Sequence, residues 1–432
     1  MREASGQRAR GLPPFWLRYP SCSNYHERSP MSGEKNILVG QSGGPTAAIN
    51  ASLAGVVAAA RAEGCQITGM RHGIQGFLAG RTVDLGEALP DQESLTLLRQ
   101  TPASWLGSCR FKLPNLSDQA FYEDTLTRLD MAGIDAVLYI GGNDSMDTIA
   151  KLGTYGARVG SPIRFIGVPK TIDNDLVGTD HTPGYGSAAK FVATSCGELF
   201  RDADVYDLKS VTFVEIMGRD AGWLAGASAL AGPRGAGRPD LVLLPEVPLG
   251  EDALMEHIAD LLSRQNTVMV GVSEGVRTAD GTLICERTVA AGTGTDEFGH
   301  LAQLSGTSRY LAGLAKSRLG CKTRAVELST LQRCASHVAS EVDLDEAFEL
   351  GQAGVRAALD GQTAKMCALT RVSDEPYRTV PALLDVVEIA NKVKPVPRAW
   401  ISADGMDVTE DFERYARPLI DGIPARLAPL AQ

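Results

Sequence analysis

The sequence predicts an α/β fold in which helices cover both faces of mainly parallel sheets. Short apolar runs of strand length alternate with amphipathic segments of helix length along most of the 432 residues. This alternation is typical of parallel sheets whose strands are connected by helices. Glycine-rich, polar turns directly follow several of the apolar runs. Ligands of such folds bind at the carboxyl ends of the strands, so we expect the functional site where these turns meet.

The predicted strands are runs of β-branched and other apolar residues, which suit strands that are buried on both faces. They span residues 36–40, 136–140, 164–168, 211–216, 241–244, 267–272, 323–328 and 365–369. The predicted helices are the longer segments between these runs, in which apolar residues recur with helical spacing. They span residues 47–62, 144–153, 186–200, 222–231, 251–264, 300–318, 344–359 and 380–393.

Composition and charge exclude several classes of function. Hydrophobic residues make up 44% and charged residues 22% of the chain, as in globular proteins, and no run approaches the ~18 apolar residues of a membrane helix. The net charge of −10 argues against a general binder of nucleic acid or anionic membranes. The cysteines and histidines are scattered without metal-ligand spacing. We therefore expect neither disulfides nor zinc, and the reduced thiols suit a cytoplasmic enzyme.

Residues 1–34 differ from the rest of the chain. They contain five arginines and four prolines and lack apolar periodicity. Met31 begins a stretch that looks like an ordinary start before the first predicted strand. We predict a disordered N-terminal extension that the fold does not need, and a targeting peptide is the alternative.

Two turns at predicted strand ends have the composition of anion-binding loops. Gly43 and Gly44 follow the first strand, where small residues let backbone N–H groups approach an anion at a helix N-terminus. Such a Gly-Gly turn is also common as a simple tight connection. Asp144 lies in the turn after the second strand. It is a candidate site residue or, alternatively, an acid that stabilises the start of a helix.

A third turn combines acidic and basic residues. Asp173 and Asp175 flank Asn174, and Lys170 precedes Asp173 by three residues. Two carboxylates so close repel each other unless a cation, a metal or a proton intervenes, although a solvated turn holds them at little cost. Phosphoryl transfer needs such carboxylates for a metal and a base, and a cation for the developing charge. The three turns together therefore predict phosphoryl transfer.

Further polar residues suit a phosphorylated sugar. Arg219 lies at a predicted strand–helix junction, where it is placed for bidentate binding of phosphate or, alternatively, for a surface salt bridge with Asp220. Glu274 follows another strand and is able to accept hydrogen bonds from sugar hydroxyls. Arg324 and Arg333 flank a predicted strand and suit a second phosphate.

Several motifs resemble, in this order, those of the 6-phosphofructokinase family: SGGPTAAINASL, LGSCRF, IGGNDS, PKTIDND, EIMGRDAGW, SEG and TRAVELSTLQR. The resemblance extends from about residue 35 to about residue 400. TIDND together with MGR is very specific, whereas GGxxS alone also suits the related NAD-kinase and diacylglycerol-kinase folds. The resemblance implies two similar Rossmann-like three-layer lobes with mostly parallel sheets and an active site in the cleft between them.

The resemblance also implies a division of the chain. We expect residues 35–186 to form the lobe that binds the phosphoryl donor, with part of residues 329–390 packing back on it. Residues 187–328 are expected to form the lobe for fructose 6-phosphate. Residues 391–432 are expected to form a C-terminal tail.

The motifs that match the family imply a role for each residue. Asp173 is implied as the base that takes the proton from the sugar 1-hydroxyl, and Lys170, Asp144 and Arg219 as the other catalytic residues. The residues implied to bind fructose 6-phosphate are Thr171, Ile172, Asp173, Met217, Gly218, Arg219, Glu274, Arg324 and Arg333. Those implied to bind pyrophosphate are Gly43, Arg110 and Lys170. The implied ligands of Mg²⁺ are Asn143, Asp144 and Asp175.

Two positions predict the phosphoryl donor. ATP-dependent members of the family typically have glycine where this chain has Asp144 and Lys170. A carboxylate at Asp144 repels a nucleotide α-phosphate, while an ammonium group at Lys170 favours a short, highly charged diphosphate. The resemblance therefore implies reversible phosphoryl transfer from pyrophosphate to fructose 6-phosphate. An ATP-dependent phosphofructokinase and a non-catalytic subunit of the same fold are the alternatives.

The resemblance leaves the metal site and the assembly less defined. Asn143 stands where many relatives have a magnesium-binding Asp, and a neutral amide is a weaker ligand for a hard cation. Because the family shares its sites across subunits, a homodimer or homotetramer is expected. The expected partners are the two substrates, with no nucleic acid and no membrane.

Overall fold

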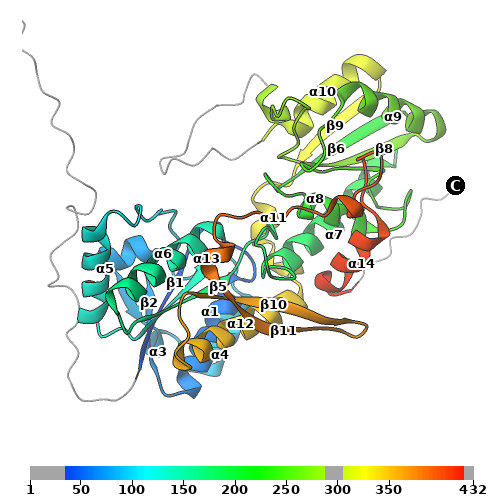
Figure 1. The fold of residues 1–432 in the computed structure, drawn as a ribbon. Coiled ribbons are helices and arrows are strands. Elements are labelled where there is room, and N and C mark those ends of the chain that lie inside the picture. Colours follow the sequence, from blue (N-terminus) through cyan, green and yellow to red (C-terminus); the bar gives the residue numbers. More distant parts are fainter. Residues whose placement is uncertain (1–34, 288–304, 423–432) are drawn as a thin grey trace, which may run out of the picture.

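The computed structural model describes residues 35–287 and 305–422. The predicted extension of residues 1–34 and the first residues of the predicted helix 300–318 lie outside this part of the chain. Two α/β lobes lie side by side, each built around its own sheet (Figure 1). Most strand pairs in both sheets are parallel, so the predicted fold class is confirmed.

The first lobe contains a seven-stranded sheet with the order β11-β10-β5-β4-β1-β2-β3. Its central strands are buried at every position and consist mainly of apolar residues, so they need helices on both faces. Strands β2–β3 and β10–β11 pair antiparallel at the two edges of the sheet. The strands are β1 (Asn36–Gln41), β2 (Gln66–Met70), β3 (Thr82–Asp84), β4 (Ala136–Gly141), β5 (Arg164–Pro169), β10 (Lys365–Asp374) and β11 (Tyr377–Asp385).

Helices cover both faces of the first sheet (Figure 1). One face carries α1 (Ile49–Ala62), α3 (Leu85–Ala88), α4 (Gln92–Gln100) and α12 (Glu341–Leu359). The other carries α2 (Gly73–Leu78), α5 (Gln119–Met131), α6 (Asn143–Val159) and α13 (Val386–Ile389). The backbones of α1 and α12 approach closely, because a Cβ atom at Gly55 would lie 2.0 Å from the carbonyl oxygen of Phe348. The segment that contains α12, β10 and β11 thus completes the first lobe.

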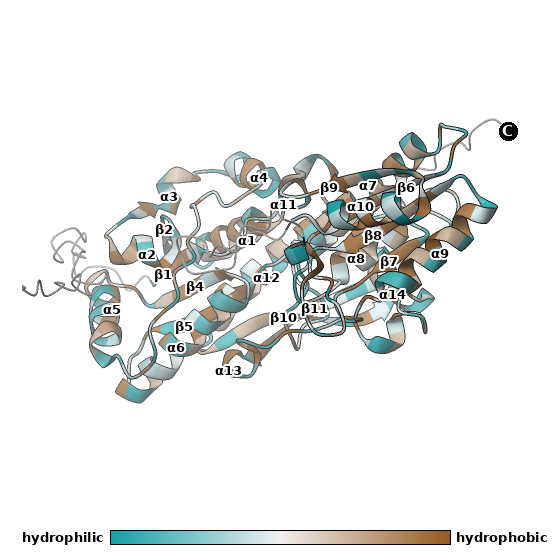
Figure 2. Ribbon diagram, turned by 90° about the horizontal axis from the view of Figure 1, so that it is seen from above, coloured by the Kyte–Doolittle hydropathy of each residue, from teal (hydrophilic) through white to brown (hydrophobic). Residues whose placement is uncertain are grey.

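The second lobe contains a four-stranded parallel sheet with the order β7-β8-β6-β9. Figure 2 shows apolar residues concentrated on these strands and mixed colours on the outer helices. The strands are β6 (Ser210–Ile216), β7 (Leu241–Leu243), β8 (Thr267–Ser273) and β9 (Lys322–Glu327). The α-helices are α7 (Tyr185–Ala203), α8 (Trp223–Ala227), α9 (Glu251–Arg264), α10 (Thr307–Leu319), α11 (Leu331–Cys334) and α14 (Glu410–Ala416). Helices α9 and α10 pack on one face of the sheet, and α7, α8 and α14 contribute to the core on the other.

Short 3₁₀ helices complete the described part of the second lobe and its C-terminal segment. They are η3 (Ser228–Ala231), η4 (Ile284–Arg287), η5 (Ser336–Val338), η6 (Arg398–Trp400) and η7 (Arg417–Ile420). None of the helices in residues 35–287 and 305–422 is long and apolar enough to cross a membrane.

One predicted helix is wrong. Residues 380–393, predicted as a helix, form the second half of β11 and then the short helix α13. Burial in β11 alternates residue by residue, as in a strand with one covered face, and the strand pairs along β10 from Asp385 back to Tyr377. This pairing also extends β10 to Asp374, five residues beyond its predicted end. Long-range pairing has here overridden a weak helical pattern.

Other departures concern the lengths and the number of elements. The predicted helix 222–231 is divided into α8 and η3. The sequence interpretation also missed several elements, most of which are short: β2, β3, α2, α3, α4, α5, α11 and α14.

A buried ionic network stabilises the first lobe. It lies in and beside the loop of residues 170–184, which connects β5 to α7 and is called the Asp173 loop below. The ring of His181 lies between two carboxylates, 2.9 Å from Asp180 Oδ2 and 2.6 Å from Glu346 Oε2. Tyr377 and Thr379 of β11 donate hydrogen bonds to the other oxygen of Glu346. Burial alone would lower the pKa of His181, but Glu346 and Asp180 outweigh burial and raise the pKa to about 9. The imidazolium form therefore stabilises the fold.

We expect His181→Gln to destabilise the protein by about 3–5 kcal/mol near pH 6, because it removes one partner of a buried ion pair. The pKa of His181 is raised from its ordinary 6.5 to about 9. Its contribution is thus fully present below pH 6.5 and is lost as the pH rises through 9. Thermal midpoints of the unmodified protein and of His181→Gln, measured between pH 6 and pH 9.5, check this. His257 is exposed, so His257→Gln is the control. A destabilisation that does not change with pH contradicts the expectation.

Candidate active site

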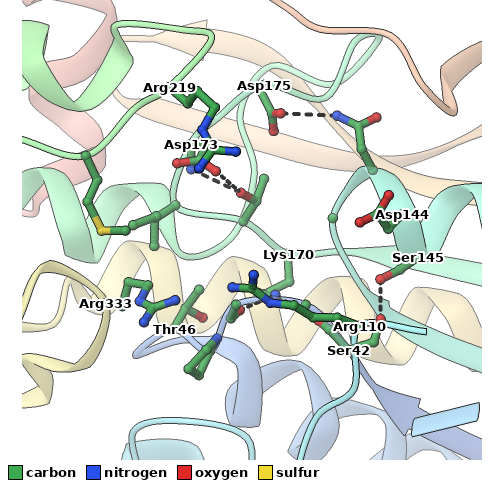
Figure 3. A pocket seen from close by; sticks show the side chains of 18 of the residues that line it. Ser42, Thr46, Arg110, Asp144, Ser145, Lys170, Asp173, Asp175, Arg219 and Arg333 are labelled. Atoms are coloured by element: carbon green, nitrogen blue, oxygen red, sulfur yellow. Dashed lines mark hydrogen bonds between the residues drawn. The ribbon is translucent and has the colours of Figure 1, made fainter. Parts of the chain in front are cut away.

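A pocket of about 340 Å³ lies between the two lobes. The first lobe contributes the turns after β1, β4 and β5, and the second contributes residues after β6 and β8 and from α11. Figure 3 shows the labelled side chains around this pocket. The predicted site residues that line it are Gly43, Arg110, Asn143, Asp144, Lys170, Thr171, Ile172, Asp173, Asp175, Met217, Arg219, Glu274 and Arg333. These residues come together because carboxyl ends of parallel strands share one edge of each sheet.

The turn after β1 passes over the side chain of Lys170. Gly43 has a φ of 76°, a left-handed conformation that favours glycine, and a Cβ atom there would lie 3.6 Å from Lys170 Nζ. The N–H of Gly43 donates a hydrogen bond to the carbonyl oxygen of Cys109. This amide is thus paired within the protein, and the binding of pyrophosphate by Gly43 stays a prediction.

The ammonium group of Lys170 is buried beneath this turn. It donates hydrogen bonds to the carbonyl oxygens of Ser42 (3.1 Å) and Gly44 (2.5 Å). Burial lowers the pKa of Lys170 to about 8, although the carboxylate of Asp173 opposes this shift. An ammonium group has three donors, and these two bonds use two of them. Lys170 therefore holds the turn after β1 in addition to placing a positive charge at the pocket.

The turn after β5 directs two carboxylates into the pocket. Asn174, between them, has a φ of 54°, which Asn tolerates better than most residues. Its side chain donates to the hydroxyl of Tyr415 and accepts from the N–H of Thr182. Asn174 thus fixes the turn that presents Asp173 and Asp175. The sequence interpretation missed this role, although an Asn between two acids at a strand end is itself a turn signal.

Asp173 and Asp175 influence each other's ionisation. Burial raises the pKa of Asp173, while hydrogen bonding to Thr171 and the charges of Lys170, Arg333 and Arg219 oppose the rise. Burial and the neighbouring Asp173 raise the pKa of Asp175 to about 7. Thr171 Oγ1 lies 3.4 Å from Asp173 Oδ2 and accepts the backbone N–H of Asp173. The carboxylate of Asp173 thus lies among cations, whereas that of Asp175 lies beside the side-chain amide of Asn143.

The first turn of helix α6 lines the pocket. Asn143, its first residue, donates from Nδ2 to Asp175 Oδ2 over 3.1 Å. Its Oδ1 atom is buried and has no hydrogen-bond partner in the described part of the chain. Asp144 lies in the first turn of the helix, where an acid is favourable, and it pairs with Lys112 over 3.3 Å. Its side chain is 49% exposed, so this carboxylate stands at the pocket mouth.

The second lobe supplies the opposite wall. Met217 and Arg219 follow β6, and the N–H of Met217 donates to the buried side chain of Gln332. Burial and the charge of Asp173 raise the pKa of Glu274 to about 8. The guanidinium of Arg333 lies against the first lobe, since a Cβ atom at Gly44 would be 3.2 Å from its Nη1. Gln332 was not predicted, because its contact depends on a distant turn.

Two predicted residues do not line the pocket. Gly218 lies behind the wall, where its N–H is 3.5 Å from Glu274 Oε1. Arg324 lies on β9, in a separate shallow depression with Tyr206 and Lys322, and pairs with Asp202. Asp220, the alternative partner considered for Arg219, lies 3.7 Å from Arg277. The phosphate-binding role predicted for Arg324 therefore has no support from the pocket of a single chain.

Two sheet lobes, with paired carboxylates, a buried lysine and several arginines around the pocket between them, are typical of a two-lobed α/β phosphotransferase. The family model described as Phosphofructokinase matches residues 36–358. The chain belongs to the phosphofructokinase family.

Individual relatives cover nearly the whole chain. It is 42% identical over 401 residues to a pyrophosphate–fructose 6-phosphate 1-phosphotransferase of Xanthomonas campestris pv. campestris, covering 92% of this chain and 93% of that protein. It is 40% identical over 393 residues to the protein of the same name from Halomonas elongata, covering 90% and 92%. The crystal structure of a pyrophosphate-dependent phosphofructokinase from Marinobacter aquaeolei is similar, with a TM-score of 0.79 at 34% identity and coverage of 90% and 92%.

Proposed function

We propose that this protein catalyses reversible transfer of a phosphoryl group from pyrophosphate to the 1-hydroxyl of fructose 6-phosphate. The products are fructose 1,6-bisphosphate and phosphate. The observation that supports this most strongly is the position of Asp173 among Lys170, Arg219 and Arg333 in a pocket between two lobes. The names of relatives that cover about nine tenths of the chain support the same reaction.

The proposed chemistry needs one base and several cations. Asp173 accepts the proton of the 1-hydroxyl as that oxygen forms its bond to phosphorus and phosphate leaves. Arg219 and Lys170 stabilise the negative charge on the transferred group, which is the main contribution a protein makes to phosphoryl transfer. Glu274, Met217 and Arg333 hold the sugar phosphate on the opposite wall.

In this proposal, the choice of phosphoryl donor depends on Asp144 at the mouth of the pocket and on Lys170 at its floor. The half-exposed carboxylate of Asp144 stands at the mouth, where a nucleotide would extend beyond its β-phosphate. Buried Lys170 lies on the floor, where a compact diphosphate ends. Repulsion at the first position and attraction at the second favour pyrophosphate over ATP.

Mg²⁺ is part of the proposal because the donor side offers oxygen ligands. The unpartnered Oδ1 of Asn143 lies next to Asp175, and both oxygens suit a hard cation. The described residues contain no group of three or more His, Cys, Asp or Glu able to hold a metal. These two residues would therefore share the ion with pyrophosphate oxygens, as is usual for Mg²⁺. When bound, the ion neutralises charge on the phosphate oxygens.

We expect Asp175→Asn to weaken binding of the divalent ion at least about 10-fold, because it replaces the charged ligand beside Asn143. Electron paramagnetic resonance of Mn²⁺, titrated with imidodiphosphate present, measures this affinity directly. Asp147 lies on α6, the helix of Asn143, and pairs with Lys151 outside the pocket, so Asp147→Asn is the control. Equal Mn²⁺ affinity for Asp175→Asn and the unmodified protein would exclude Asp175 as a ligand.

The assembly and the location are part of the proposal as well. The distance of Arg324 from the pocket favours an assembly of two or four copies, in which Arg324 reaches the sugar phosphate of a neighbouring copy. The cysteines of the described residues are all free, which suits the reducing cytoplasm.

The reverse reaction tests the proposed function. Fructose 1,6-bisphosphate and inorganic phosphate, incubated with the enzyme and Mg²⁺, are expected to give pyrophosphate that ³¹P nuclear magnetic resonance detects. If ADP supports reversal and phosphate does not, the enzyme is an ATP-dependent phosphofructokinase. If neither does, the protein is a non-catalytic member of the family.

A further inference from the structure

A short C-terminal segment connects the two walls of the pocket. Helix α13 is followed by residues that run between the Asp173 loop of the first lobe and the loop before α8 of the second (Figure 1). The N–H of Lys394 donates a hydrogen bond of 2.7 Å to the carbonyl oxygen of Asp175. The indole N–H of Trp223 donates to the carbonyl oxygen of Lys394 over 2.8 Å. One residue is thus bonded to both lobes.

A second contact holds the C-terminal segment on the second lobe. Glu246 Oε1 accepts the N–H of Val396 over 2.8 Å and the N–H of Gly222 over 2.9 Å. Gly222 is three residues beyond Arg219. A single carboxylate oxygen therefore fixes the C-terminal segment to the turn that supplies Arg219 to the pocket.

The ammonium group of Lys394 is fully used inside the Asp173 loop. It donates to the carbonyl oxygens of Asp180 (2.8 Å) and Thr179 (3.2 Å) and to Asn174 Oδ1 (3.3 Å). It also lies 5.0 Å from the centre of the Trp223 ring. Three acceptors match the three donors of an ammonium group. Lys394 is not among the residues that line the pocket, so it acts on the loop and does not contact substrate.

We propose that Lys394 is a positioning residue, which fixes the loop bearing Asp173 and Asp175 relative to the Arg219 turn of the second lobe. The proposal rests on the proposed function for the roles of Asp173 and Arg219. The left-handed Asn174 between the two acids depends on bonds from outside the loop, and Lys394 supplies one of them. A displacement of about 1 Å in such a group is enough to reduce turnover about 10²-fold.

A lysine suits this place better than other cations. Its compact ammonium group directs three donors to convergent oxygens, whereas the guanidinium of Arg is a flat fork. The other charged groups near Lys394 are Asp175, Asp180 and Arg371. Asp180 is held separately by His181 and Arg371, so loss of Lys394 releases the part of the loop nearest the acids.

Lys394→Met, with Lys392→Met as the matched control, tests the proposal. Lys392 is an exposed lysine of the same segment. We expect Lys394→Met to lower kcat by about 30- to 100-fold and to change the KM for fructose 6-phosphate less than threefold. Hydrogen exchange of peptides from residues 171–184 is expected to become faster in Lys394→Met only. If Lys394→Met does not fold, Lys394→Gln is used in its place, because the amide of Gln still donates hydrogen bonds.

The outcomes separate positioning from general stabilisation. A folded Lys394 variant with kcat within twofold of the unmodified enzyme, or with unchanged exchange in residues 171–184, overturns the proposal. A lower thermal midpoint with unchanged kcat indicates a merely structural residue and overturns it as well. Because hydrogen exchange needs no substrate, this failure is distinguishable from failure of the proposed function, which an inactive unmodified enzyme would show.

Discussion

Asp173→Asn is expected to lower kcat of the pyrophosphate reaction by about 10³-fold. A positioned general base contributes on the order of 10²–10⁴-fold, and Asn keeps the shape of the side chain without its basicity. Asp173 lies in the pocket with Thr171 at its carboxylate and with Lys170, Arg219 and Arg333 as the nearby cations. The KM for fructose 6-phosphate should change much less than kcat, because the residues proposed to bind the sugar in the second lobe remain.

Initial rates at saturating concentrations of both substrates measure this effect. Asp220→Asn is the control, since Asp220 is an acid of the same pocket wall whose side chain is 60% exposed and faces Arg277. We expect Asp220→Asn to stay within about fivefold of the unmodified enzyme, as is usual for exposed ion pairs. Should Asp173→Asn retain full turnover, another group is the base.

Replacing Asp144 and Lys170 by Gly is expected to lower kcat/KM for pyrophosphate by about 10²–10³-fold and to admit ATP as a donor. Loss of one preorganised hydrogen-bond donor that stabilises the charge of the transition state has an effect of this size. Lys170→Gly also removes the bonds to Ser42 and Gly44 that hold the turn after β1. Asp144→Gly removes the negative charge at the mouth, where a nucleotide has to pass.

The single variants separate the two contributions. Asp144→Gly is expected to improve ATP use without much loss of pyrophosphate use, and Lys170→Gly to reduce pyrophosphate use alone. Thermal midpoints show how far the cavity left by the buried Lys170 side chain destabilises the fold. A double variant with unchanged pyrophosphate activity refutes the explanation of donor choice.

The central strands were predictable from the sequence because they are buried on both faces. Strands β1, β4 and β5 are apolar at nearly every position, since helices cover both faces of the sheet. Strand β11 has one partly exposed face at the edge of the sheet and depends on pairing with β10. No local pattern records that pairing, so the segment was predicted as a helix.

The site was predictable where it consists of strand ends. Strand β5 is followed by Lys170, Asp173 and Asp175, and the neighbouring parallel strand β4 is followed by Asn143 and Asp144. Their convergence therefore follows from the parallel sheet. The supporting contacts were not predictable, because they join distant parts of the chain. Gln332 supports Met217, and Tyr415 and Lys394 support Asn174. The use of the Gly43 amide by Cys109 likewise follows only from the folded chain.

The central claim is that this phosphofructokinase uses pyrophosphate and not ATP. Initial rates of fructose 1,6-bisphosphate formation, measured with each donor at the same Mg²⁺ concentration, test it most directly. We predict that kcat/KM for pyrophosphate exceeds that for ATP by at least about 10³-fold, which corresponds to roughly 4 kcal/mol of discrimination. Equal values, or activity with ATP alone, would contradict the roles given to Asp144 and Lys170.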